Sequence, residues 1–239
     1  ILPNPYSLSG SGVEYPSGRT FNIEGGSFYD HSIKFNDDGT KMYILGRSPD
    51  IVTQYTLSSA YDITTAVYEL EFNVGAQETN PTGLRFNAAG TKMYIVGFSG
   101  DEVNEYSLST AFDVSSATFV SNFSVSSQES SPGFIAFGGN KMFVGGAASD
   151  RVYQYSLAAA GNPISTAVYD NVSFSFSSQD GSPVEIEFNP DGTKMFILGT
   201  TNDSIFQYSL STAYDISTAT YDGLSLSTRS LAVTPESIR

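Results

Sequence analysis

The fold is decided by a stretch that reads Phe188-Asn-Pro-Asp-Gly-Thr-Lys-Met-Phe-Ile-Leu-Gly199. Its Gly-Thr-Lys-Met motif, at 192–195, recurs at 39–42 and 90–93, and as Gly-Asn-Lys-Met at 139–142. The four motif lysines are 51, 49 and 53 residues apart, and a Gln-Tyr or Glu-Tyr pair follows each motif at a similar step. A fixed period near 50 residues indicates a repeat protein whose units stack on their neighbours.

One unit contains four short strand patterns. Residues 32–36 alternate polar and apolar side chains, and an Asp-Asp-Gly turn leads into the apolar, aromatic-rich segment 41–46. A third strand is expected at 51–57 and a fourth at 67–74, with a turn-rich segment of Ser, Thr and Asp between them. Four antiparallel strands in each repeat predict an all-β protein, in which each unit is one blade of a β-propeller.

The two ends of the sequence match parts of one further unit. Residues 6–8 and 20–23 match third and fourth strands, while residues 234–239 match the start of a first strand. We therefore predict a single five-bladed propeller domain whose last blade is closed by strands from both termini, which leaves no open sheet edge. The expected blades are residues 27–76, 77–127, 128–178 and 179–223, with a closing blade made of 1–26 and 224–239.

Composition excludes several classes of protein. The 239 residues carry 25 Asp and Glu against 11 Lys and Arg, a formal net charge of −14, and no Cys. Without Cys there is no disulfide scaffold, zinc thiolate site or cysteine nucleophile. Nucleic-acid binding needs clustered Lys and Arg, so we expect no nucleic-acid partner. No apolar run approaches the ~20 residues of a membrane span, so we expect no membrane insertion.

The repeat resembles a known propeller repeat. Together with Tyr208-Ser-Leu-Ser-Thr-Ala-Tyr-Asp-Ile-Ser-Thr-Ala219, the stretch quoted above is similar to a repeat abundant in marine bacteria and their phages. Such repeats often occur in tail-fibre and cell-surface proteins, so the resemblance implies an extracellular or virion location. This sequence departs from many relatives at Tyr61, Phe112 and Tyr214, where they carry Trp. The sequence shows no signal peptide and begins at Ile1 rather than Met, which suggests excision from a longer polypeptide.

Two recurring motifs have a structural interpretation. In Gly-Thr-Lys-Met we expect Gly to set the hairpin, Met to pack between blades, and Lys to lay its stem along the sheet with its amine in water. Asp62, Asp113 and Asp215 are each followed by an apolar residue and then Ser or Thr. This pattern is typical of turns in which the side chain bonds the nearby backbone.

Loop geometry identifies candidate ligand-binding residues. In a four-stranded blade, the loop between strands two and three emerges at the same end of the ring as the loop to the next blade. These two sets of loops share a recurring series of carboxylates and amides: Asp50, Gln77, Glu78, Asp101, Gln128, Glu129, Asp150, Gln179, Asp180 and Asp203. Such a series could accept hydrogen bonds from sugar hydroxyls or bind Ca²⁺, which prefers several oxygen ligands. The alternative is that each Asp caps a turn and each Gln ties one blade to the next.

Residues that break the repeat are further candidates. His31 is the only histidine, and Phe98 is an aromatic at a loop position where the other units differ. Arg85, Ala136 and Glu187 differ at equivalent positions along the expected inner strands. His31 could also be a hydrogen-bonded surface group, and a single exposed Phe needs no functional explanation.

These observations predict a protein that is not an enzyme. We expect a multivalent carbohydrate-binding domain of a phage virion appendage or of a bacterial surface or secreted protein. Its partner would be a cell-surface glycan or a virion or surface protein, it could form homo-oligomers, and it would need no cofactor unless Ca²⁺ binds. The alternatives are a structural or assembly domain of a virion or extracellular fibre, and a carboxylate-dependent glycoside hydrolase. A hydrolase needs two carboxyl groups in different environments, whereas the candidate carboxylates recur with the blades.

Overall fold

The computed structural model describes residues 29–158 and 163–228, which form four antiparallel sheets of four strands each. Within each sheet the strands follow one another in sequence order. The first sheet contains β1 (Tyr29–Phe35), β2 (Lys41–Arg47), β3 (Ile51–Leu57) and β4 (Ala66–Asn73); the second contains β5 (Pro81–Phe86), β6 (Lys92–Gly97), β7 (Glu102–Leu108) and β8 (Ala117–Ser124). The third contains β9 (Pro132–Gly138), β10 (Lys141–Gly146), β11 (Arg151–Ser156) and β12 (Val168–Ser175); the fourth contains β13 (Pro183–Phe188), β14 (Lys194–Gly199), β15 (Ser204–Leu210) and β16 (Ala219–Ser227).

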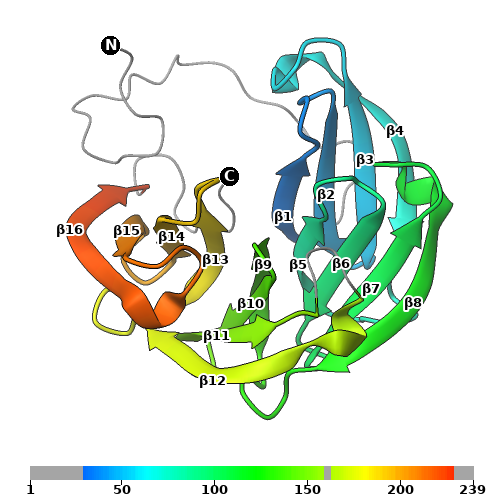
Figure 1. Cartoon of the computed structure of the whole chain (residues 1–239). Coiled ribbons are helices and arrows are strands. Elements are labelled where there is room, and N and C mark those ends of the chain that lie inside the picture. The colour runs from blue at the N-terminus through cyan, green and yellow to red at the C-terminus, as the bar shows by residue number, and fades with distance from the viewer. Residues whose placement is uncertain (1–28, 159–162, 229–239) are drawn as a thin grey trace.

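The four sheets are the blades of a β-propeller. They stand in an arc around a common axis, with β1, β5, β9 and β13 innermost and β4, β8, β12 and β16 along the outer rim (Figure 1). The inner strands contact one another in turn from β1 to β13. The predicted all-β propeller of four-stranded antiparallel blades is therefore confirmed. No helix in the described part of the chain is long and apolar enough to cross a membrane.

The prediction of five blades is corrected to four blades in the described ranges, and no closure by both termini is shown. Residues 1–28 and 229–239, on which most of the fifth blade was predicted, lie outside those ranges. The fourth blade extends past the predicted boundary at about 223, because β16 continues to Ser227 and pairs with β15 on both sides of a bulge. Gly223, with a φ of 72°, sits in a bulge that the strand passes without ending.

Short 3₁₀ turns separate the third and fourth strands of every blade: η1 (Ile63–Thr65), η2 (Val114–Ser116), η3 (Ile164–Thr166) and η4 (Ile216–Thr218). Asp62, Asp113 and Asp215 each accept a hydrogen bond from a backbone N–H two residues later, as expected of N-caps. Pro163 takes this place in the third blade and makes no side-chain cap. The predicted turn role of the three aspartates is confirmed.

The motif methionines are buried in the core, whereas the motif lysines form ion pairs. Met42, Met93, Met142 and Met195 are at most 1% exposed, so their predicted place in the core is confirmed. The lysine amines do not simply lie in water, because each forms an ion pair in its own blade. The pairs are Lys41–Glu69, Lys92–Glu105, Lys141–Asp170 and Lys194–Asp222.

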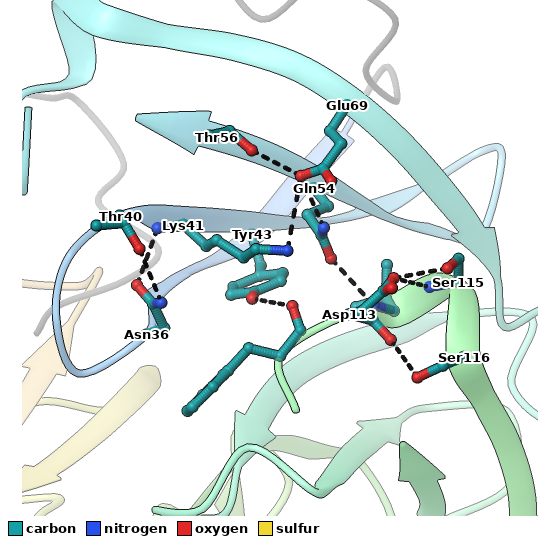
Figure 2. A network of polar contacts seen from close by, with 12 residues as sticks. Asn36, Thr40, Lys41, Tyr43, Gln54, Thr56, Glu69, Asp113, Ser115 and Ser116 are labelled. Carbon is teal, nitrogen blue, oxygen red and sulfur yellow. Dashed lines mark hydrogen bonds and ion pairs between the residues drawn. The ribbon is translucent and has the colours of Figure 1, made fainter. Parts of the chain in front are cut away.

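A polar network joins each of the first three blades to the next. Figure 2 shows the first junction, where Gln54 donates to Glu69 over 2.9 Å and its carbonyl accepts from the N–H of Val114 in η2 over 3.0 Å. Glu105 and Gln154 accept in the same way from the N–H groups of Ile164 and Ile216. In the second blade, Val120 occupies the bulge position that Glu69 holds in the first blade. Lys92 therefore pairs with Glu105 instead. The recurring Lys and Gln therefore stabilise the stacking of blades.

Candidate functional site

Three of the predicted acidic residues are buried and fix loops. Glu78 is fully buried and accepts hydrogen bonds from the N–H groups of Asn80, at 2.7 Å, and Ser99, at 3.1 Å. Glu129 and Asp180 bind the corresponding loops of the next two blades. Each carboxylate thereby joins the segment that enters a blade to that blade's loop between the second and third strands.

The predicted glutamines have an equally local role. The side-chain carbonyl of Gln77 accepts from the hydroxyl of Tyr106 over 3.2 Å, and the same contact recurs between Gln128 and Tyr155 and between Gln179 and Tyr208. Because each tyrosine belongs to the blade that follows the glutamine, this contact anchors the connection between blades.

The four predicted aspartates lie in the loops between second and third strands. Their backbone carbonyls accept hydrogen bonds from the residues that follow the outer strands, such as Val74 for Asp50 and Val125 for Asp101. Asp101, Asp150 and Asp203 have φ values of 49°, 51° and 46°, which are uncommon outside glycine and typical of tight turns. No group of three or more His, Cys, Asp or Glu side chains in the described residues could hold a metal ion. A role for these residues in ligand binding stays a prediction.

Of the two symmetry-breaking candidates, Phe98 lies in the loop that also contains Asp101, and His31 lies in a strand. His31 lies in β1 at the bulge between the pairs Asp30–Gly46 and Ser32–Leu45. Phe98 is 36% exposed, and its N–H donates to the carbonyl of Asn80.

The inner strands instead carry a charged cluster that joins residues far apart in the sequence. We call Lys34, Arg85, Glu185 and Glu187 the axial cluster. Lys34 of β1 contacts Glu185 of β13 over 2.7 Å. Arg85 of β5 contacts Glu185 over 3.0 Å and also pairs with Glu187. Two cations and two carboxylates thus balance one another at the axis.

Sequence register explains why these side chains meet. Lys34, Arg85, Ala136 and Glu187 each precede the phenylalanine near the end of an inner strand, and they face equivalent residues of the second strands. Side chains at one register of neighbouring inner strands point to the same level of the axis. Arg85 is further held by the carbonyls of Ile135 and Ile186, each 2.7 Å from a guanidinium nitrogen.

The cluster is strongly desolvated, and its members depend on one another. Burial lowers the pKa of Lys34, and nearby Arg85 lowers it further, while Glu185 and Glu187 act in the opposite direction. Burial also acts against the charge of Arg85, yet Glu187 and Glu185 together raise the pKa of Arg85 above its usual value. Removing one partner from such a buried set leaves an uncompensated charge, which is far more costly than removing an exposed one.

A pocket lies beside the cluster, at the end of the inner strands where the β1–β2 and β5–β6 hairpins turn. Its volume is about 250 Å³, and the axial residues Lys34, Arg85 and Glu187 contribute to it. Its other walls include Ala136 and a group of aromatic residues: Phe35, Phe86, Phe112 and Phe137. This axial pocket is at the opposite end of the blades from the loops that hold the predicted carboxylates. It combines convergent polar groups with aromatic surface, the usual composition of a small-molecule site.

Sequence reasoning found part of this site. Arg85, Ala136 and Glu187 stood out because they differ at one repeat position, and all three line the axial pocket. Lys34 occupies the same repeat position in the first blade, but it was not among the predicted residues. Glu185 was missed as well, although the third blade has Phe134 and the second Gly83 at that place in the repeat.

Comparison with known proteins supports the architecture alone. No protein-family model matches the sequence, and no curated protein does. Among solved structures, a functionally unknown protein from Desulfotomaculum acetoxidans DSM 771 is similar, with a TM-score of 0.56 at 13% identity over 85% of this chain and 58% of that chain. A candidate 6-phosphogluconolactonase from Bacteroides fragilis NCTC 9343 has a TM-score of 0.56 at 13% identity over 87% and 56%. Another, from Bacteroides uniformis ATCC 8492, has 0.52 at 12% identity over 82% and 56%.

The class that the fold defines is therefore the β-propeller. The chain spans less than three fifths of the length of the three similar structures, which are 56–58% covered. Identities this low show a shared fold and not a shared activity.

Proposed function

We propose that the chain is a non-enzymatic recognition propeller that binds one sugar ring in the axial pocket. The observation that supports this most is the pocket's combination of Arg85, Glu187 and Lys34 with aromatic walls. Hydroxyl groups can donate to the carboxylate of Glu187 and accept from the guanidinium of Arg85, while the rings cover the apolar face of a sugar. At about 250 Å³ the pocket is smaller than the ~300–1,000 Å³ typical of drug-sized ligands, which suits a single ring.

The proposed number of sugar sites per chain differs from the multivalent domain predicted from the sequence. The pocket is built from residues that differ between blades, so it occurs once per chain rather than once per blade. Multivalent binding to a glycan surface would then come from several copies of the chain, held together in an oligomer or in a virion appendage or bacterial surface protein. The extracellular or virion location is part of this proposal, and a cell-surface glycan is its intended partner.

The names of the similar structures raise hydrolysis as the competing function, since two are candidate lactonases. The axial carboxylates are both engaged in ion pairs within the cluster: Glu185 contacts Lys34 and Arg85, and Glu187 pairs with Arg85. Lys34 is 4% exposed at its side chain and bonded to Glu185, so its amine is not available to a substrate. We therefore assign the pocket to binding.

A glycan-array screen with and without Ca²⁺, followed by titration of the best sugar, tests this function. Ala136→Leu would place extra side-chain volume in the pocket without removing a charge, and we expect it to weaken binding at least about tenfold. Ala147→Leu is the matched control, because Ala147 is exposed in a loop at the opposite end. Thermal unfolding would verify that both variants are folded.

Two results would overturn the proposal. Either no sugar on the array binds, or Ala136→Leu binds the selected sugar as tightly as the control does. Turnover of a lactone or glycoside that Glu187→Gln abolishes would show that the protein is an enzyme instead.

A further inference from the structure

Three of the four blades place an aromatic ring against their own hairpin glycine. The residues are Tyr61 over Gly39, Phe112 over Gly90 and Tyr214 over Gly192, and a Cβ added to any of these glycines would lie 2.2–2.5 Å from the ring. The N–H of each aromatic residue also donates to the carbonyl of its glycine. We call the space that the ring occupies, beside the hairpin of the preceding blade, the ring slot.

The backbone shows that filling the slot is favourable. Tyr61, Phe112 and Tyr214 have φ values of 59°, 57° and 57°, in the left-handed region that bulky residues rarely adopt. Such a conformation costs roughly 1–3 kcal/mol and persists only where the surroundings compensate for it. The packed ring and its hydrogen bond to the hairpin provide that compensation.

The third blade has no aromatic residue for its slot. Its corresponding loop, residues 158–162, reads Ala-Ala-Ala-Gly-Asn. A pocket of about 450 Å³ lies at this place between the second and third blades, and its walls include Ala89, Tyr94, Phe137, Gly139 and Leu157. Gly139 has a φ of 56°, and a Cβ added to it would lie 3.5 Å from the ring of Tyr214 in the fourth blade.

The walls of this open slot match those of the filled slot one blade earlier. In the filled slot, Phe86 lies 5.8 Å from the ring of Phe112, and the hydroxyl of Tyr43 donates to the Phe112 carbonyl over 2.6 Å. Phe137 and Tyr94 occupy the corresponding repeat positions in the open slot. Tyr94 is 2% exposed, and its hydroxyl has no hydrogen-bond partner within the part of the chain that the structure describes.

We propose that the open slot binds an aromatic residue of a partner polypeptide. Its ring would pack against Phe137, and its backbone carbonyl would accept the hydrogen bond of Tyr94. We propose a peptide rather than a free aromatic compound, because in the filled slot one residue, Phe112, provides both the ring and the carbonyl that accepts the hydrogen bond. A cavity of about 150 Å³ already accepts benzene, so about 450 Å³ has room for a ring with its backbone. The site goes beyond the sugar pocket, which it adjoins through Phe86 and Phe137.

The test uses N-acetyl-phenylalaninamide as the probe, titrated into the full chain and followed by NMR. We expect saturable binding of one equivalent, at least tenfold tighter than that of N-acetyl-alaninamide, with shifts in the signals of Tyr94 and Phe137. Ala89→Trp should abolish binding by filling the slot. Asp38→Trp is the matched control at the same hairpin position of the first blade, where Phe112 already fills the neighbouring slot, and should bind normally. Tyr94→Phe should weaken binding about 2- to 10-fold, the usual effect of one lost hydrogen bond.

A variant that opens a second slot gives an independent measurement. Phe112→Ala removes one ring while Tyr43 and Phe86 remain. This variant should therefore bind two equivalents of the probe. The probe should also raise the melting temperature of the variant more than that of the wild type. The proposal is overturned if the wild type shows no saturable binding, or if Ala89→Trp binds as the wild type does. Binding of p-cresol without binding of the amide would also overturn it, in favour of a small aromatic ligand. Each of these results leaves the sugar test unaffected, because that test depends on Ala136→Leu.

Discussion

Arg85 links three of the four described blades through its guanidinium group. Its guanidinium reaches the carboxylates of Glu185 and Glu187 and the carbonyls of Ile135 and Ile186, so it joins the second blade to the third and fourth. Arginine suits this role because its planar group presents several donors in fixed directions and keeps its charge when buried. The same group forms part of the proposed binding surface, so stability and recognition depend on one side chain.

Arg85→Met is expected to lower the free energy of unfolding by about 3–5 kcal/mol, because it leaves two acidic groups at the axis with one cation. Chemical denaturation at neutral pH measures this change. The control is Arg151→Met, since Arg151 bonds only partly buried Ser173 and should cost about 1 kcal/mol or less. Equal losses in the two variants would contradict the importance of the axial cluster.

Buried tyrosines make stability sensitive to alkaline pH. Burial raises the pKa of six described tyrosines above the ordinary value of 10.0: Tyr43, Tyr94, Tyr106, Tyr155, Tyr208 and the partly buried Tyr214. Above pH 10 the unfolded chain therefore releases protons that the folded chain retains, so the free energy of unfolding should fall as the pH rises further. Lys34 has the opposite effect on the pH dependence of the free energy of unfolding, because folding lowers its pKa. This single group is outweighed by the several tyrosines.

Denaturation measured from pH 8 to pH 11 checks this expectation. We expect a plateau up to about pH 9.5 and a steep decline beyond it. Tyr106→Phe should make the decline shallower, since it removes one titrating group that folding protects. A flat profile through pH 11 would contradict the burial of the tyrosines.

At the level of elements, periodicity predicted most of the structure because the contacts within a blade are local. The hairpins, the four strands of each unit and the capping aspartates all follow from short-range patterns of turn residues and alternating side chains. The ion pairs of the motif lysines were missed because their partners lie 13–29 residues away, and three of the four partners are at bulges that the alternation does not reveal. The end of β16 was missed for the same reason, since a bulge at Gly223 interrupts the pattern while the strand continues.

Packing between blades depends on the motif methionines. Met93 is fully buried among residues of the first and second blades, including Leu84 and Val74. Met93→Ala should therefore lower the free energy of unfolding by about 2–5 kcal/mol through lost burial and the cavity left behind. Val120→Ala is the control, because Val120 is 49% exposed and should change stability by less than about 0.5 kcal/mol. Similar effects of the two substitutions, measured by urea denaturation, would contradict the proposed packing.

Across the whole molecule, the residues that repeat in every blade and the residues that break the repeat have different roles. The repeated residues, including Gln77, Glu78 and their equivalents, hold loops and join blades. Both candidate binding regions arise where the repeat is broken, at the unequal inner positions of the axis and at the third blade's missing aromatic ring. The axial cluster could not be located from sequence alone, because Lys34 and Glu185 are 151 residues apart and only the curvature of the arc brings them together.

The central claim is that recognition occurs at the axis, at the hairpin end of the blades. A crystal structure of the chain soaked with the best sugar from the array tests this claim most directly. We expect a sugar ring in the axial pocket, with hydroxyl groups bonded to Arg85 and Glu187 and one face against Phe112. A sugar bound at the opposite end, among the loops of Asp101, Gln128 and Glu129, would contradict it.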